Sequence, residues 1–500
     1  MATVKSSKKK MNKPPGQALP AVRVRMFRQG LGDCFLITFD VDGNERHMLI
    51  DCGTLGKKST DVEIEDIAEH IFEAIGTDGR LDVVIATHEH QDHLSGFRNA
   101  ALRKLKGKVE HVWLAWTEDP KDDVARQLAK NKQDLGRALA TIVEAQPLAE
   151  VSNHVRDLLG FAGDISAGPL GFAETVNEAM EFVRTGLGGT AVYHRPGELI
   201  EEAWLPGFRI YVLGPPRSAK WLKELGSHGN DGLYGLQKAA ELHSALRADQ
   251  QMLPADSGQQ ISVEFGQPFD QQYNWNFQSS KKEFYPEYCD QDNQWRAVEH
   301  DWLSIASDLA LQLDSITNNT SLAIAIERIG DGKVLLFPAD AQLGSWLSWH
   351  EPDIKWTILE DTGLVRKVTA ADLLARTVFY KVGHHASHNA TAREKGLEMM
   401  LTQDELTAFI PVDREVALTR NPKGSWQMPA PMLYRSLLEK CQGRVARSDI
   451  GWARKPMPGQ TNEIQFAALA SDAMWKQWEA AQDAAENVTI DDLFVEYTLK

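Results

Sequence analysis

The chain lacks several features that would place it in a specialised class of protein. It has no apolar run of about 18 residues, the length that a membrane-spanning helix needs, so we expect no membrane span. It has only four cysteines in 500 residues, none of them in a CxxC pair, and this usage is typical of the reducing cytoplasm. Its formal net charge of −16 argues against a broad basic surface for duplex DNA.

The first twenty residues are basic and contain proline, but no apolar segment follows their lysines. They therefore do not have the form of a secretory signal. We expect residues 1–20 to be a disordered basic tail, with an arm that touches nucleic acid as the alternative. The remaining chain, with 43% hydrophobic and 25% charged residues overall, has the composition of a soluble globular protein with a large core. We therefore predict a cytoplasmic location.

The most informative segment is Thr87–Gly96, which contains His88, His90, Asp92 and His93. It follows the apolar run 81–86, which is typical of a buried strand. A strand that ends in His-x-His-x-Asp-His can present two imidazoles to one cation, then a carboxylate and a third imidazole to a second. These are ligands that zinc and similar ions prefer. We therefore predict two divalent ions, zinc or manganese, which can activate a water molecule between them.

The rest of the chain divides by its pattern of apolar residues. Turn residues and alternation predict a β-meander over 21–53, and the spacing of isoleucines predicts a helix over 64–75. We expect a helical insertion at about 120–188 and an insertion rich in aromatic and polar residues at about 217–294, both within one domain spanning 21–460. We expect a C-terminal helix and strand, in 461–500, to pack on that domain. Further strands are predicted at 192–213, 322–326, 334–337, 378–382 and 408–412, with the C-terminal helix at 466–485 and its strand at 493–497.

Two later segments are candidate partners of the first motif. Asp340 follows an apolar strand, and a carboxylate at a strand end can bridge two cations. His384 and His385 follow the apolar strand 378–382 and precede Ser387. One imidazole can ligate the second cation, and the other can act as an acid or stabilise a developing negative charge.

In this order, Asp51, the His88–His93 cluster, Asp340 and His384-His385 resemble the motifs of the metallo-β-lactamase superfamily. The closer resemblance is to the hydrolase domain of the competence DNA-uptake protein ComEC and its soluble relatives. The motifs that carry it are Gln29-Gly30-Leu31-Gly32-Asp33, Asn319-Thr320-Ser321-Leu322, His384-His385-Ala386-Ser387 and Arg447-Ser448-Asp449-Ile450-Gly451. The resemblance covers about Val22 to Trp452, apart from the two insertions. It implies a four-layer αββα sandwich, in which two mixed sheets lie face to face and the cations sit at one edge.

The resemblance also implies roles for individual residues. The cations are expected on His88, His90, Asp92, His93, Asp340 and His384, with Asp51 orienting a ligand from behind. The sequence does not decide between His384 and His385; we favour His384 as the ligand and His385 as the group that faces the substrate. Ser387 and Asn319 are candidate contacts to a phosphate, and Asp92 and His385 are the candidate catalytic groups.

The sequence also departs from the family pattern. The histidine that usually completes the first cation site has no match, because Asn318 and Asn319 stand at that position. Alanines, Ala339 and Ala386, replace two usual glycines. Histidines in or near the second insertion offer a substitute ligand, although a solvent-facing position is the simpler interpretation: His228, His243 and His300.

Three functions are open at this point. The first is a phosphodiesterase or nuclease, for which single-stranded nucleic acid would suit the aromatic insertion because bases stack on exposed rings. The second is a hydrolase of a small ester, lactone or cyclic nucleotide, which needs no extended basic surface. The third is a metal-stabilised interaction subunit without activity, which would bind a protein partner through the two insertions.

Overall fold

The computed structural model describes residues 19–55, 60–77, 79–145, 174–222, 313–360, 363–420 and 427–500. The expected basic tail lies almost wholly outside these ranges. The part of the second insertion beyond residue 222 also lies outside them, together with His228, His243 and His300. Among the described residues, no helix is both long enough and apolar enough to cross a bilayer.

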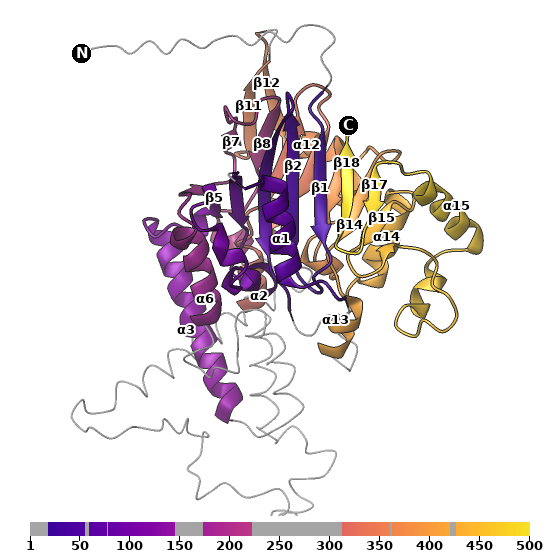
Figure 1. Ribbon diagram of the computed structural model, residues 1–500, viewed down its shortest axis with the longest axis horizontal. Helices are drawn as coiled ribbons and strands as arrows, with labels where there is room; N and C mark the ends of the chain where they lie inside the picture. The colour runs from indigo at the N-terminus through magenta and orange to yellow at the C-terminus, as the bar shows by residue number, and fades with distance from the viewer. Residues whose placement is uncertain are drawn as a thin grey trace, which may run out of the picture.

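Two eight-stranded sheets form the centre of the molecule (Figure 1). The first sheet has the order β17-β18-β1-β2-β3-β4-β5-β6. Its strands are β1 (Val22–Phe27), β2 (Cys34–Val41), β3 (Asn44–Cys52), β4 (Leu81–Ala86), β5 (Val109–Ala115), β6 (Thr190–His194), β17 (Val488–Ile490) and β18 (Phe494–Leu499).

The second sheet has the order β16-β15-β14-β13-β10-β9-β8-β7. A separate antiparallel pair, β11 (Lys355–Leu359) and β12 (Val365–Thr369), projects beyond it at the top of Figure 1. The strands of the second sheet are β7 (Leu199–Ile200), β8 (Phe208–Val212), β9 (Ile324–Arg328), β10 (Val334–Phe337), β13 (Thr377–Lys381), β14 (Thr407–Ile410), β15 (Val445–Arg447) and β16 (Gly451–Trp452).

Three clusters of buried apolar side chains hold the layers together. One contains residues of both sheets, such as Phe35 and Phe337, whose rings lie 6.2 Å apart, and it forms the core between the sheets. A second packs α1 (Ile64–Ile75) and α6 (Glu174–Glu181) on the outer face of the first sheet. A third packs further helices on the second sheet, so the predicted αββα order is confirmed. Those helices are α11 (Leu343–Ser348), α12 (Ala370–Ala375), α14 (Pro431–Lys440) and α15 (Asp472–Asp483).

Helix α1 illustrates how the sequence produces this layering. Ile67, Ala68, Ile71 and Ile75 recur at helical spacing and are buried. Burying each isoleucine contributes roughly 2 kcal/mol. A capping box between Glu63 and the third residue of the helix fixes its start. The predicted bounds of this helix agree with the structure.

One predicted helix is wrong in its extent. The segment 466–485 is divided into a 3₁₀ turn over Ile464–Leu469 and α15, which begins at Asp472. The break occurs because the Ser471 side chain accepts a hydrogen bond from the Met474 amide and so caps the second helix. The helical insertion predicted at about 120–188 contains α3 (Asp123–Ala145) and α6. Residues 146–173 lie outside the described residues.

Parallel pairing brings four strand ends to one edge. Strands β3 and β4 are parallel, with Ile50 opposite Ile85, and β10 and β13 are parallel, with Leu336 opposite Tyr380. The carboxyl ends of all four strands lead into the segments that carry Asp51, His88, Asp340 and His384. The short helix α2 (Gln91–Leu94) lies at this edge, at the lower end of the sheets in Figure 1.

Candidate metal centre

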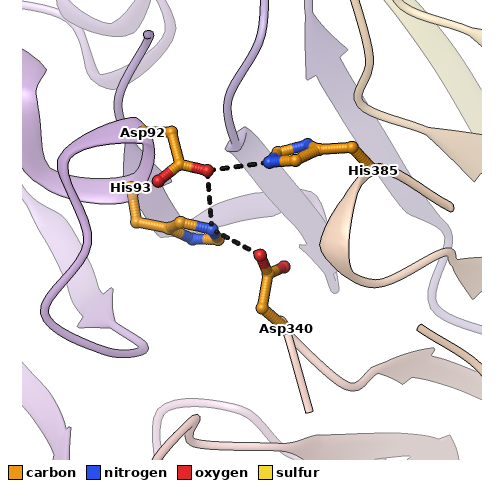
Figure 2. A group of neighbouring side chains, drawn as sticks. All are labelled: Asp92, His93, Asp340 and His385. Atoms are coloured by element: carbon orange, nitrogen blue, oxygen red, sulfur yellow. Dashed lines mark hydrogen bonds and ion pairs between the residues drawn. The ribbon is translucent and has the colours of Figure 1, made fainter. Parts of the chain in front are cut away.

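Two imidazoles and two carboxylates from three distant segments meet at this edge. One ligand atom from each of Asp92, His93, Asp340 and His385 lies within 4.8 Å of all the others. Figure 2 shows the four side chains pointing toward a common centre. Asp92 and His93 lie on α2, which follows β4, and the other two lie on the segments that follow β10 and β13. His385 Nε2 lies 2.7 Å from Asp92 Oδ2, and His93 Nε2 lies 3.2 Å from Asp340 Oδ2.

The two remaining histidines of the first motif face each other beside this group. His88 and His90 are almost fully buried, and His88 Nε2 lies 3.1 Å from His90 Nδ1. Burial lowers the pKa of His90 to about 3 and that of His88 well below its usual value, with neighbouring histidines adding to the effect on His88. Both rings are therefore neutral, as cation ligands must be.

The Asp51 side chain fixes the loop that carries these ligands. The Thr87 amide donates to its Oδ1 at 2.8 Å, and the Thr87 hydroxyl donates to its Oδ2 at 2.7 Å. His93 Nδ1 donates to the same Oδ2 at 2.8 Å, which leaves His93 Nε2 directed at the centre. Asp51 therefore has the geometry of a carboxylate that orients a ligand from behind.

The structure arranges His384 and His385 the opposite way from the arrangement that we favoured. His385 lies in the group of Figure 2, and its Nδ1 donates to the Pro411 carbonyl at 2.6 Å. The His384 ring instead contacts Ser387 Oγ at 2.7 Å and Asn389 Oδ1 at 3.2 Å. The cause is the backbone, because both histidines have a positive φ, 43° and 51°, that turns successive side chains in directions which strand alternation does not predict.

Neither predicted substrate contact lies in the four-residue group. Ser387 hydrogen-bonds His384 and Asn389. The Asn319 amide accepts from the Gln342 backbone at 3.2 Å and donates to the Leu222 carbonyl at 3.4 Å, so it joins loops of the fold. Their roles in binding a substrate stay predictions.

Three charged residues of the site were not among the predicted ones. Asp33, from the glycine-rich turn before β2, forms an ion pair with Lys381, which is 2% exposed. Lys381 Nζ also donates to Asp340 Oδ1 at 3.1 Å. Asp314 lies 3.8 Å from His90 Nε2. A lysine that ends an otherwise apolar strand is a signal that could have identified Lys381, whereas a single aspartate in a helical turn gives no such signal for Asp314.

The charges of the group favour a cation. Burial alone would lower the pKa of His93, but the surrounding carboxylates of Asp340, Asp33, Asp92 and Asp51 raise it well above its usual value. The pKa of His385 is raised in the same way by Asp92 and Asp340, against the effect of its burial. Divalent cations can take the place of the protons that these carboxylates otherwise hold on the two rings.

Unsatisfied atoms support the same interpretation. Among the described residues, Asp92 Oδ1 is buried and makes no hydrogen bond, and His93 Nε2 and Asp340 Oδ2 face each other, at 3.2 Å. Leaving a carboxylate oxygen such as Asp92 Oδ1 buried and unpaired is costly, so it needs another partner. The donor set of imidazole nitrogens and carboxylate oxygens suits zinc or manganese. The residues present therefore fit a metal centre.

Close packing of glycines holds the first motif against the turn before β2. A methyl group added to Gly53 would lie 2.3 Å from the Asp92 carbonyl carbon, and one added to Gly32 would lie 2.5 Å from the Asp92 oxygen. The Asp33 amide also donates to the Asp92 carbonyl at 3.0 Å. The glycine-rich turn therefore supports the backbone of a candidate ligand.

The sequence model of the metallo-beta-lactamase superfamily matches residues 28–172, which include Asp51 and the cluster His88 to His93. Residues 28–172 therefore match a metallo-beta-lactamase superfamily domain. No curated protein matches the chain at a significant level. The αββα layers and the metal-ligating side chains at the sheet edge are those of this fold, and together they support a metal-dependent hydrolase.

Proposed function

We propose that this protein is a metal-dependent phosphodiester hydrolase, with single-stranded nucleic acid as the leading substrate class. The observation that carries the proposal is the convergence of Asp92, His93, Asp340 and His385 on one point beside His88 and His90. The resemblance to ComEC-type hydrolase domains directs it to phosphodiesters.

In this proposal His88 and His90 would hold one cation, and Asp92, His93, Asp340 and His385 would hold the second. Zinc or manganese, when bound, would supply a Lewis acid for the phosphoryl group and an activated water. Lys381 and the His384 amide both hydrogen-bond Asp340 Oδ1, which keeps Oδ2 turned toward the cations. His384, held by Ser387 and Asn389, is the imidazole that lies next to the ligands. Burial lowers the pKa of His384 to about 4, so it would act as a neutral hydrogen-bonding group toward the phosphoryl oxygens.

A cleft of about 470 Å³ lies beside the first motif, and both acidic and basic side chains line it. Glu89, between the two histidines of the motif, lines it and accepts a hydrogen bond from Lys132 at 2.7 Å. Basic side chains of α3 and of the turn after α6 line the same cleft and can face a phosphate: Arg126, Lys130 and Arg184.

The test is hydrolysis of bis-p-nitrophenyl phosphate and of single-stranded DNA by the full chain with added Mn²⁺ or Zn²⁺. We expect activity that a chelator abolishes and that Asp92→Ala and His88→Ala lose. His350→Ala is the matched control, because the His350 ring contacts the Lys395 carbonyl at 2.8 Å and is not one of the four side chains that converge in Figure 2. Activity that survives both site substitutions would contradict the proposal.

Hydrolysis of a small ester, lactone or cyclic nucleotide is the second candidate, favoured by the net charge of −16. A panel of these substrates separates the two, since only the true class will show metal-dependent turnover. A subunit without activity would instead bind metal, turn over no ester and co-purify with a protein partner.

A further inference from the structure

The His90 ring has two nitrogens in different surroundings. Its Nδ1 faces His88 Nε2 at 3.1 Å, so these two atoms are directed at a common point. Its Nε2 faces Asp314 Oδ1, at 3.8 Å. Of the two nitrogens, Nδ1 is therefore the one placed to share a cation with His88, and Nε2 is placed to interact with a carboxylate.

Asp314 is held so that one carboxylate oxygen is directed at His90. Its side chain is 10% exposed, and Asn318 Nδ2 donates to its Oδ2 at 3.1 Å. Its Oδ1 is buried and makes no hydrogen bond among the described residues. Asp314 and Asn318 are four residues apart on one helical turn, so they share a face of that turn.

The geometry separates two roles that Asp314 could have. A ligand of the first cation would have to approach His88 Nε2 and His90 Nδ1 together. Asp314 Oδ1 faces His90 Nε2, the ring nitrogen on the other side from the Nδ1 that faces His88. It lies instead behind the His90 ring, as carboxylates do when they hydrogen-bond a metal-bound imidazole.

We propose that Asp314 is a positioning residue that accepts a hydrogen bond from His90 Nε2–H and so fixes Nδ1 as the ligand atom of the first cation site. This inference rests on the proposed function only in requiring that His88 and His90 hold a cation. Asn318 and Asn319 stand where the usual third histidine is missing. The proposal gives the segment just before them a function in the same site. The contact needs to shorten by about 1 Å to become a hydrogen bond, a change within the reach of one side-chain rotation.

The effect expected from removing Asp314 is specific. Without the carboxylate, His90 can bind its proton on either nitrogen and can turn away from His88. Loss of such a partner typically weakens cation binding 10–100-fold. The second site, which has four side chains of its own, keeps its affinity.

The experiment compares Asp314→Ala and Asp314→Asn with the unmodified full chain, and uses Asp353→Ala, at an exposed position, as the control. Zinc affinities are measured by competition with a chromophoric chelator. The tautomer of His90 is read from the ¹⁵N shifts of histidine-labelled protein, with the His90 signal assigned through His90→Gln. Asparagine retains an oxygen that can accept from Nε2–H but is a poor cation ligand, so it distinguishes positioning from ligation.

We expect Asp314→Ala to weaken binding of the cation at the His88–His90 site 10–100-fold, Asp314→Asn to lie within about threefold of the unmodified chain, and His90 to carry its proton on Nε2. Unchanged binding in Asp314→Ala would overturn the proposal. So would a loss in Asp314→Asn as large as in Asp314→Ala, which would make Asp314 a ligand. A proton on His90 Nδ1 would overturn it even if both variants failed to fold.

Neither readout uses catalysis, so the two proposals can fail separately. Metal-dependent turnover with no effect at Asp314 would leave the function standing and remove this inference. If the tautomer and the affinities are as expected but no ester is turned over, this inference stands and the proposed function is contradicted.

Discussion

His385 Nε2 lies 2.7 Å from Asp92 Oδ2, although 293 positions separate the two residues in the chain. One comes from the loop after β4 of the first sheet, and the other from the loop after β13 of the second. The contact therefore joins the two sheets at the edge where the candidate ligands meet, and it makes His385 rather than His384 the partner of Asp92 and His93.

This relationship predicts different outcomes for two adjacent substitutions. His385→Ala should remove one bound cation per chain and reduce turnover on the order of 100-fold or more, because it deletes a member of the four-residue group. His384→Ala should keep the cation content and change turnover only. Elemental analysis of the purified variants measures the first effect, and cation loss in His384→Ala alone would refute the arrangement.

Asp51→Asn should weaken cation binding about 10–100-fold, because one of the two carboxylate oxygens that accept from Thr87 and His93 becomes a donor. We also expect a loss of about 1–3 kcal/mol in unfolding free energy from the buried bonds. Asp82→Asn is the matched control: Asp82 accepts from the His47 amide at the other end of β4. It should lower stability and leave cation affinity, measured by chelator competition, unchanged.

Gly53→Ala should impair cation binding from a position without a ligating group. The added methyl would lie 2.3 Å from the Asp92 backbone. Backbone atoms cannot rotate away as a side chain can, so the segment with Asp92 and His93 must shift. We expect a loss of about 1–3 kcal/mol or more in stability together with reduced metal content. Gly43→Ala is the control, because its φ of 80° makes alanine strained while nothing lies within 4 Å of the new methyl. Equal metal content in the two variants would contradict the packing argument.

Glu118 should make stability depend on pH. Its burial, with the nearby Glu89, raises the pKa of Glu118 to about 7. Between about pH 4.5 and 7 the folded chain therefore holds a proton that the unfolded chain releases. This contribution is full below the unfolded pKa and is lost as pH rises toward 7, by up to about 3 kcal/mol.

Urea unfolding at pH 5, 6 and 7, in the presence of chelator, measures this dependence. Glu118→Gln should flatten the decline, whereas Glu110→Gln, on the exposed part of β5, should retain it. A decline that is equally steep in both variants would show that Glu118 is not its source.

Apolar periodicity and the motifs at strand ends were enough to predict most of the strands and the layers of the fold. The αββα class followed from the resemblance of the strand-end motifs to those of the metallo-β-lactamase superfamily, and α1 followed from its isoleucines. The break before α15 was missed because it depends on one capping hydrogen bond of Ser471. The β11–β12 pair was missed as well, because a short half-exposed hairpin gives little apolar signal.

Within the site, unusual backbone conformations limited how well the sequence could predict the directions of the side chains. Asp51, Ala339, His384, His385 and Ala386 all have φ between 43° and 60°, a region that non-glycine residues rarely adopt. No repeating pattern governs side-chain directions there, so the sequence could not decide between His384 and His385. Asp314 depends on a loop-to-helix contact across more than 220 residues of sequence, which no local pattern reveals.

The pairing of β1 with β18 has a consequence for how the chain is made. Arg25 and Glu496, partners across these strands, are 471 positions apart, and β18 lies between β17 and β1 in the first sheet. On a ribosome, β1 therefore emerges long before its neighbour has been synthesised, and it presents an unpaired edge during that time. Assembly of the first sheet is therefore completed only after Leu499 has been synthesised.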